Sequence, residues 1–295
     1  MNVFAQFLVN GIVAGSVYAL IALGFALIFT ASRVFHFAHG AVYTLSAFVG
    51  YSALVIFNLG TIASFASAII IAVALGTLIN EALYEPMREL GVSSFVMMIC
   101  SFGLLIIITH LTAIFWGTNP VVLWRGGQET VHEFWSIRIT ERQLGIVGLT
   151  ALLGVGLWVF FKFFRLGIAI RALGNDSELA LIYGMPARKL RNISFAVGSA
   201  LAGVSSLMIG FNVGIIDFNM GFDVILMATV AMIIGGLGNV SAAAGGGFIL
   251  GVIQNVALWK IDSKWQMALS FSILILVLLF RPSGFFGEKQ SAVGL

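Results

Sequence analysis

Charged residues are scarce in this chain. Only 9% of its 295 residues are Asp, Glu, Lys or Arg, whereas 60% are hydrophobic, and the mean hydropathy is +1.07. A soluble protein of this length could not hide so much apolar surface, because a large part of any folded surface remains in contact with water. The composition therefore excludes a soluble domain and indicates a protein that crosses a membrane several times.

Cysteine is nearly absent, and a signal peptide is not expected. The single cysteine, Cys100, has no partner for an internal disulfide and lies within an apolar run, so a packing role is favoured over a reactive thiol. The N-terminus lacks the basic segment that begins a signal peptide. Because its first apolar run continues to Thr30, we expect this run to be a retained membrane helix.

The common catalytic and nucleotide-binding motifs are missing as well. The sequence contains no G-x-x-x-x-G-K-[ST], no H-E-x-x-H and no G-x-S-x-G, so neither ATP binding by a P-loop nor these hydrolase chemistries are expected. His36 and His39 share one helical face, but no nearby Cys, Asp or Glu supplies a third metal ligand. We expect no enzyme activity, no cofactor and no metal on this chain, and a structural hydrogen-bonding role for the two histidines near the inner mouth.

Long uncharged runs define the fold class. They are too long and too uniformly apolar for the alternating strands of a barrel, so each predicts a membrane-crossing α-helix. The seventh is short and ends in "GGLGN", which is consistent with a full span, a broken helix or a re-entrant segment. We predict an all-α, polytopic transmembrane helical bundle of eight or nine crossings, forming one domain over residues 1–295. The apolar runs are 7–30, 38–57, 61–80, 92–116, 145–164, 193–211, 222–238, 242–259 and 265–280.

Basic residues predict the orientation. The loop 165–191 carries the strongest Lys/Arg cluster of the chain, and such clusters remain on the cytoplasmic side. Alternation then places 31–37, 81–91 and the C-terminus inside, and the longest loop, 117–144, outside. With nine crossings the N-terminus is outside.

Glycine pairs predict close helix packing. Gly11 with Gly15, and Gly247 with Gly251, form small-xxx-small patterns that let two helix backbones approach closely. The glycines of 235–239 and 242–247 permit either tight packing or an unwound helix lining a cavity. Packing is the favoured interpretation.

The polar insert 171–191, "RALGNDSELALIYGMPARKLR", predicts a short capped helix. Asn175 is suited to the N-cap, with Glu178 three residues later, and Gly184 is suited to end the helix. A helix this short is marginal alone, so its apolar residues must be covered by the membrane surface or by a cytoplasmic protein. Because the helix itself is acidic and the basic residues flank it, a groove on a protein is favoured over lipid.

Four stretches carry a family resemblance. They are the insert with its following helix (171–210), "NGIVAGSVYALIALGFALIFT", "NMGFDVILMATVAMIIGGLGNVSAAAGGGFILGVIQ" and "ILVLLFRPSGFFG". Together they resemble LivH-type permeases of the branched-chain (hydrophobic) amino-acid ABC importers.

The resemblance implies a non-catalytic, multi-pass subunit of the bacterial inner membrane. Its expected partners are a second, homologous permease in a heterodimer, two cytoplasmic ATPases that hold ATP and Mg, a periplasmic binding protein and membrane lipid; no nucleic acid is expected. The segment 172–184 would be a coupling helix seated in an ATPase cleft. The coupling residues on this interpretation are Ala172, Gly174, Asn175, Asp176, Glu178, Leu181, Tyr183 and Gly184.

One departure from the family affects the expected cargo. At the start of the second span the family usually reads Asn-Phe-Ala-His-Gly-Glu, where this chain has "HFAHGA", so His36 replaces the asparagine and Ala41 the glutamate. The expected cargo is a small polar or amphipathic solute, first of all a branched-chain or other amino acid. The lost carboxylate leaves urea, short amides and aromatic acids as alternatives.

Polar residues within the spans are the candidates for a translocation path, because such residues are costly in a membrane unless they serve packing or passage. Serine and threonine often bond to their own helix, which disfavours Ser16, Thr44, Ser101 and Thr229. A stand-alone secondary transporter or channel is the competing class, but it would be expected to carry paired intramembrane charges, which these runs almost lack. The path candidates are Asn10, Tyr18, His36, His39, Thr109, His110 and Asn255, with Gln254 considered beside them.

Overall fold

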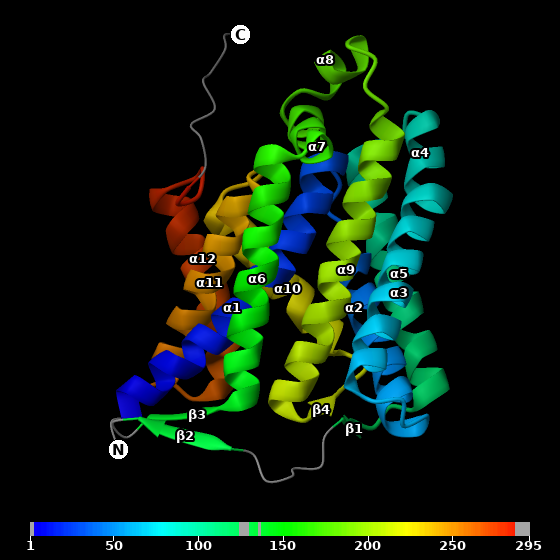
Figure 1. The fold of residues 1–295 in the computed structure, drawn as a ribbon. Coiled ribbons are helices and arrows are strands. Elements are labelled where there is room, and N and C mark those ends of the chain that lie inside the picture. Colours follow the sequence, from blue (N-terminus) through cyan, green and yellow to red (C-terminus); the bar gives the residue numbers. More distant parts are fainter. Residues whose placement is uncertain (1–2, 124–129, 135–136, 287–295) are drawn as a thin grey trace.

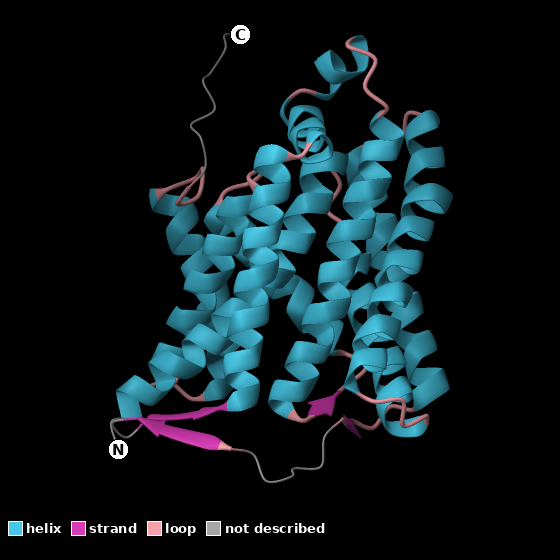
Figure 2. Ribbon diagram, in the orientation of Figure 1, coloured by secondary structure: helices cyan, strands magenta, loops and turns pink. Residues whose placement is uncertain are grey.

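A computed structural model describes residues 3–123, 130–134 and 137–286 as a bundle of helices that run roughly along a common axis. Figure 2 shows short strands at one end of the bundle and only helices and loops elsewhere. The helices are α1 (Val3–Ser32), α2 (Ala38–Tyr51), α3 (Thr61–Ile79), α4 (Glu85–Glu89), α5 (Ser94–Trp116), α6 (Glu141–Phe163), α7 (Arg165–Asn175), α8 (Ser177–Ile182), α9 (Ala187–Val213), α10 (Met220–Gly235), α11 (Val240–Ala257) and α12 (Gln266–Phe280).

Three short helical pieces and four strands complete the described structure. The π-helical turns η1 (Ser52–Ile56) and η2 (Asn80–Tyr84) extend α2 and α3, and the 3-10 turn η3 (Ser263–Trp265) leads into α12. The strands are β1 (Val121–Val122), paired antiparallel with β4 (Ile215–Ile216), and β2 (Val131–Phe134), paired antiparallel with β3 (Ile137–Thr140).

Eight helices of the described chain are long and apolar enough to cross a membrane, and α10 is a shorter apolar helix. The predicted all-α membrane bundle is confirmed, and α10 is the segment on which the count of eight or nine depends. Several predicted boundaries shift, the following two among them. The span that was expected to end at residue 80 continues through η2 to Glu89, and the span that was expected from 145 begins at Glu141, because Thr140 and Gln143 form a capping box there.

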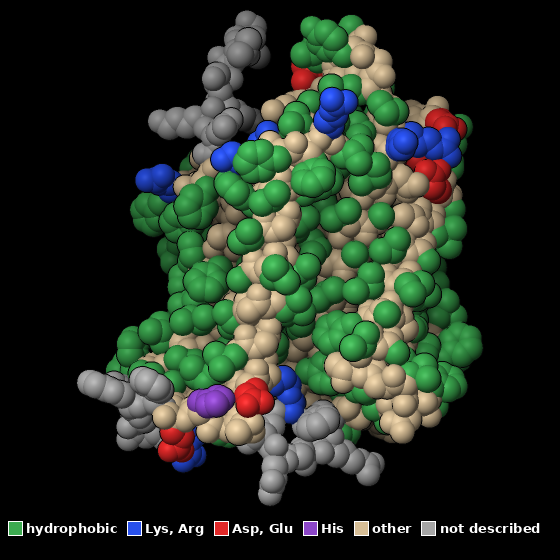
Figure 3. Space-filling view, in the orientation of Figure 1, with side chains coloured by type: hydrophobic (Ala, Val, Ile, Leu, Met, Phe, Trp, Pro, Cys, Tyr) green, Lys and Arg blue, Asp and Glu red, His purple; other side chains and the backbone are tan. Residues whose placement is uncertain are grey.

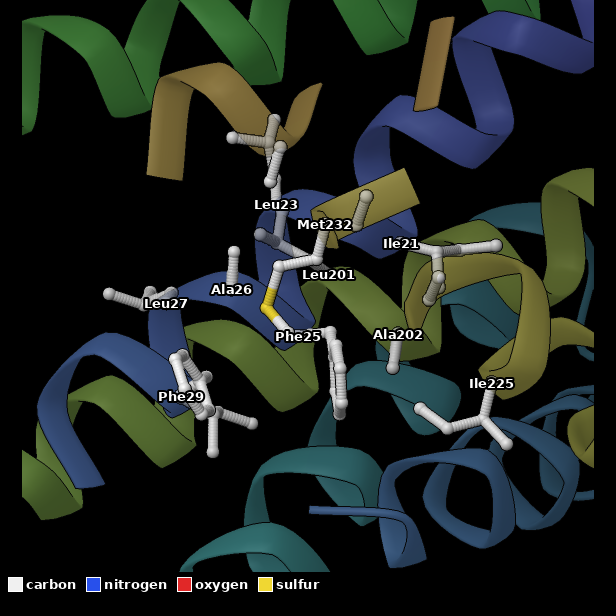
Figure 4. Packing of buried hydrophobic residues seen from close by; sticks show 14 of the residues in the cluster. Ile21, Leu23, Phe25, Ala26, Leu27, Phe29, Leu201, Ala202, Ile225 and Met232 are labelled. Carbon is white, nitrogen blue, oxygen red and sulfur yellow. The ribbon is translucent and has the colours of Figure 1, made fainter. Parts of the chain in front are cut away.

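Helix α1 is the centre of the bundle. It packs against α6, α9, α10 and α11, and 83% of its most apolar window is buried, against 11% for α6 and for α12. Figure 4 shows Phe25 and Ile21 of α1 among Leu201, Ala202 and Met232 from other helices. On the face drawn in Figure 3, charged side chains gather at the two ends and hydrophobic ones cover the length between them, as a lipid-facing surface requires.

The predicted glycine pairs lie at one helix contact. A Cβ added to Gly251 would lie 2.3 Å from the Cα of Gly15, and one added to Gly247 would lie 2.7 Å from the backbone of Tyr18. The backbones of α1 and α11 therefore touch, and this confirms the close approach. The "GGLGN" segment is a turn between α10 and α11, with Gly236 and Gly238 at positive φ, so these glycines serve a chain reversal.

Helices α2 and α10 both begin inside the bundle. The ring of His39, in the first turn of α2, lies at the level of Gly24, where a Cβ would come within 3.4 Å of its Nε2. Gly24 is two turns before the end of α1. The backbone N–H of Gly221, in the first turn of α10, donates to Thr44 Oγ1 at 3.0 Å. The start of α10 is thus seated on the first two turns of α2.

The loops are grouped at the two ends of the bundle as the predicted alternation requires. The insert 165–191, the turn after α4 and the end of α12 lie at one end in Figure 1, while the N-terminus and the four strands lie at the other. The chain after α12 folds back on α10, since the N–H groups of Phe285 and Phe286 donate to the carbonyls of Ile234 and Gly235 at 2.8 and 2.9 Å. This segment satisfies carbonyls that a helix end otherwise leaves open.

Candidate functional site

The polar insert forms two helices in series, α7 and α8, between the spans α6 and α9. Helix α7 packs against α1, α6 and α9 through a face that buries Ile170 and Leu173. Helix α8 projects beyond the end of the bundle (Figure 1). The expected short capped helix is present as α8, and Asp176, which has an extended backbone, separates it from α7.

The N-cap of α8 is Asp176, one residue later than predicted. Its carboxylate accepts the backbone N–H of Leu179 at 2.9 Å, whereas Asn175 is still helical and ends α7. Glu178 consequently lies in the first turn of α8, where its charge suits the positive end of the helix. Gly184, at φ 72°, ends the helix as predicted.

Most of the surface of α8 is free of contacts with the rest of the described chain. Ala180 is its one buried residue, and the side chains of Ile182 and Tyr183 are 80% and 76% exposed. Leu179 and Leu181 are exposed beside them. An apolar patch on a short projecting helix is stable only when another surface covers it. Helix α8 therefore presents an uncovered apolar surface at the end of the bundle.

Helix α7 is fixed to α1 immediately before α8. Arg33, which has a positive φ of 55°, donates from its guanidinium to the carbonyl of Gly174. A Cβ on Gly174 would lie 2.4 Å from the Cγ2 of Thr30, so only glycine fits this contact. Thr30 also donates to the carbonyl of Gly238 at 3.3 Å. The end of α1 thus joins the insert to the α10–α11 turn.

Helix α9 is fixed to η2 and α4 immediately after α8. Arg191 donates twice to the Glu85 carboxylate, at 2.7 Å to each oxygen, and Glu85 is only 3% exposed. Arg88 donates to Glu85 at 3.0 Å and to the carbonyl of Ser32 at 3.1 Å. This buried bidentate pair ties the base of α9 to the end of α1.

A second, exposed ion pair lies one turn away. Arg188 contacts Glu81 at 2.5 Å and Glu89 at 3.5 Å. Between α3–η2–α4 and the base of α9 lies a groove of about 840 Å³ that these charged residues line; it reaches Thr77 on one wall and Ala196 on the other. We call it the α3–α9 groove.

The candidate path residues do not converge on one site. Asn10 accepts a hydrogen bond from Gln6 at 3.2 Å, and Asn255 donates to the carbonyl of Gly251 in its own helix at 3.0 Å. Tyr18 lies at the contact of α1 with α11. These three residues belong to one helix pair.

The other candidates lie elsewhere. His110 is exposed on α5, and its Nδ1 lies 2.9 Å from the carbonyl of Ile106 in its own helix, while Thr109 is buried in the same helix. His36 and His39 are buried between helices, with His36 Nδ1 2.8 Å from the hydroxyl of Tyr84. Within the described residues no cluster of three potential metal ligands forms.

Sequence reasoning missed the polar residues of η2 and α4. Glu81, Glu85 and Glu89 repeat every four residues just past the predicted end of a span, and Arg188 and Arg191 are three apart. This matched spacing was the available signal, because it places acids and bases on single helical faces. Gln254 is also structural: it bonds Ser270 and accepts from Gln266 at 3.3 Å, which joins α11 to α12.

The described residues define a polytopic helical membrane protein with a short projecting helix between two of its spans. Comparison with known proteins specifies the class further. Residues 7–278 match the family model for the branched-chain amino acid transport system permease component, and the chain belongs to this family.

The relatives match along almost the whole chain. It is 32% identical over 299 residues to the high-affinity branched-chain amino acid transport permease LivH of Salmonella typhimurium, covering 97% of this chain and 96% of the relative. It is 30% identical to BraD of Pseudomonas aeruginosa, covering 97% of each, and 25% identical to a probable LivH of Methanocaldococcus jannaschii, covering 94% and 91%. The protein is therefore an ABC importer permease subunit, a multi-pass component whose ATPase resides on separate subunits.

Proposed function

We propose that this permease moves branched-chain or closely similar amino acids into the cytoplasm across a bacterial inner membrane. The supporting observation is the full-length similarity to permeases whose names specify that cargo, at 30–32% identity over 97% of the chain. The departure at the second span keeps urea, short amides and aromatic acids as the alternative cargoes, because the carboxylate that the family usually carries is absent at the buried Ala41.

We further propose that α8 is the coupling helix. It projects from the bundle, exposes an apolar face beside an acidic first turn, and is fixed on one side through Arg33 and on the other through Arg191. A short rod held at both flanks transmits a displacement into the spans that it joins, which alternating access requires. The proposed contact residues remain those of 172–184: Ala172, Gly174, Asn175, Asp176, Glu178, Leu181, Tyr183 and Gly184. Gly174 is buried and would act through the placement of α7.

The proposed assembly contains a second, homologous permease, two ATPases that carry ATP and Mg, and a binding protein on the opposite side. A path formed between two permeases would use residues at the surface of each. His110 on α5 is exposed and is the candidate that fits such a path most directly. Asn10, Tyr18, Thr109, Asn255, His36 and His39 stay proposals for the path or for its supports.

Uptake of labelled leucine by vesicles that contain the whole transporter tests the cargo, with urea, acetamide and benzoate as competitors. Competition by unlabelled leucine alone supports the proposal, and competition by urea, acetamide or benzoate in its place contradicts it.

A second experiment tests α8. Glu178→Lys and Gly184→Leu should abolish both ATPase pull-down and uptake, whereas Lys260→Glu, an exposed change at the opposite end of the bundle, should leave both intact. Uptake that persists without any ATPase would refute the importer mechanism.

A further inference from the structure

A column of polar side chains runs from the α3–α9 groove into the bundle, along the seam between α3–η2 and α9. The Glu85–Arg191 pair lies at its mouth. Next comes Tyr84, whose hydroxyl is 2.8 Å from Nδ1 of His36. Asn80 lies one turn deeper on the same side of the bundle and is completely buried. The column thus leads from charged groups at the end of the bundle to neutral polar groups inside it.

The column ends at a close contact between helices. A Cβ on Gly76 would lie 1.9 Å from Ser199 Oγ, and a Cβ on Gly24 would lie 2.7 Å from the carbonyl of Gly198 and 3.4 Å from His39 Nε2. Because Gly198 and Ser199 are consecutive, His39 and Ser199 lie at the same level of the bundle. This level is two turns below the end of α1.

Several polar atoms of this column lack hydrogen bonds. Among the described residues, no partner reaches Nε2 of His36, either ring nitrogen of His39, Oδ1 of Asn80 or Oγ of Ser199. The four side chains are at most 1% exposed. A buried polar group without a partner is strongly unfavourable, and proteins ordinarily satisfy such groups with ordered water that makes two to four hydrogen bonds.

The α3–α9 groove supplies a route for water to these atoms. Its lining reaches Thr77, one helical turn deeper than Asn80 on α3–η2, and Ala196, one helical turn above Ser199 on α9, so the groove spans the depth of Asn80 and ends one turn short of Ser199. The π-helical turn η2 begins at Asn80, and such turns widen a helix locally and recur at functional positions. We propose that the seam is a hydrated crevice in which water entering from the groove binds Asn80, His39 and Ser199. This inference does not depend on the cargo or on the role of α8.

Cysteine labelling tests the crevice. In a Cys100→Ala background, Asn80→Cys and Ser199→Cys are introduced into the whole transporter in inside-out vesicles and treated with a charged, membrane-impermeant methanethiosulfonate. The matched control is Leu78→Cys, two residues from Asn80 but on the outer apolar face of α3, where Leu78 is 60% exposed. Because only a hydrated thiol ionises and reacts, both crevice cysteines should react at least about tenfold faster than the control.

Lys189→Cys, at the mouth of the groove, calibrates access of the reagent. If it reacts while both Asn80→Cys and Ser199→Cys react no faster than Leu78→Cys, the seam is dry and the proposal is overturned. Ser199→Ala gives a second measurement that does not use cysteine. If the seam is hydrated, this variant has an unchanged or a lower melting temperature. A higher melting temperature would mean that the Ser199 hydroxyl had no hydrogen-bond partner, and this result would also overturn the proposal.

Discussion

Replacing Gly251 with alanine tests whether the contact of α1 with α11 holds the bundle together. The added Cβ would lie 2.3 Å from the Cα and 2.4 Å from the N of Gly15, whereas non-bonded heavy atoms prefer about 3.5–4.0 Å. Both neighbours are main-chain atoms of a helix and cannot rotate away. The two helices must therefore separate by roughly 1 Å to accept the methyl group.

The expected loss follows from two opposing effects. Overpacking a close contact destabilises a protein by about 1–3 kcal/mol, and the replacement of a helical glycine with alanine returns about 0.5–1 kcal/mol. The net expectation for Gly251→Ala is a loss of about 1 kcal/mol, the middle of a range of roughly 0–2.5 kcal/mol, which for a chain of this size lowers the melting temperature by roughly 2 °C.

Gly156→Ala is the matched control. Gly156 lies on the outer face of α6, and a Cβ there meets no atom within 4 Å. Only the gain in helix preference remains, so this variant should melt higher than the parent. Thermal unfolding of the purified chain in detergent measures both. Shifts of the same sign for the two variants, or an unchanged melting temperature for Gly251→Ala, would refute the packing argument.

Three further predictions concern the fixing of the insert. Arg191→Gln removes a bidentate partner from the buried Glu85 and should cost about 3 kcal/mol in unfolding free energy, whereas Arg188→Gln, in the exposed pair, should leave the melting temperature unchanged; equal effects would contradict the assigned burial. Gly174→Ala, which forces a Cβ against Thr30, should lower stability by about 1–3 kcal/mol, and an unchanged melting curve would show that α7 is not held there. Asp176→Ala removes the N-cap of α8 and about 1 kcal/mol of local stability, so amide exchange within α8 should accelerate roughly fivefold while exchange in α9 stays constant.

Much of the fold could be predicted because membrane helices are recognisable from their apolar composition. The long apolar runs, the sides of the loops and the glycine pair at Gly15 and Gly251 follow from lipid thickness, basic-residue placement and backbone approach. The end of α3 could not be placed in this way. In the sequence, Glu81 and Glu85 indicate the start of a loop. Their ion-pair partners on α9, Arg188 and Arg191, lie more than 100 residues later, so the local sequence does not show that the helix continues.

The candidate site was less predictable. The short helix and its end at Gly184 follow from local capping chemistry, but two adjacent residues, Asn175 and Asp176, are equally good caps, and tertiary placement of α7 decides between them. In the sequence, polarity is the one property that marks the candidate path residues. Polarity does not distinguish a side chain that bonds its own helix, as His110 does, from one enclosed between helices, as His39 is.

The fold-back of the chain after α12 has a consequence for biosynthesis. Helix α10 receives the two hydrogen bonds at its last turn from Phe285 and Phe286, about fifty residues further along the chain. When the ribosome has translated α10 and α11, those donors do not yet exist. The hydrogen bonds of the final turn of α10 are complete only after the last membrane helix has left the exit tunnel. A stalled or truncated product therefore lacks these two bonds.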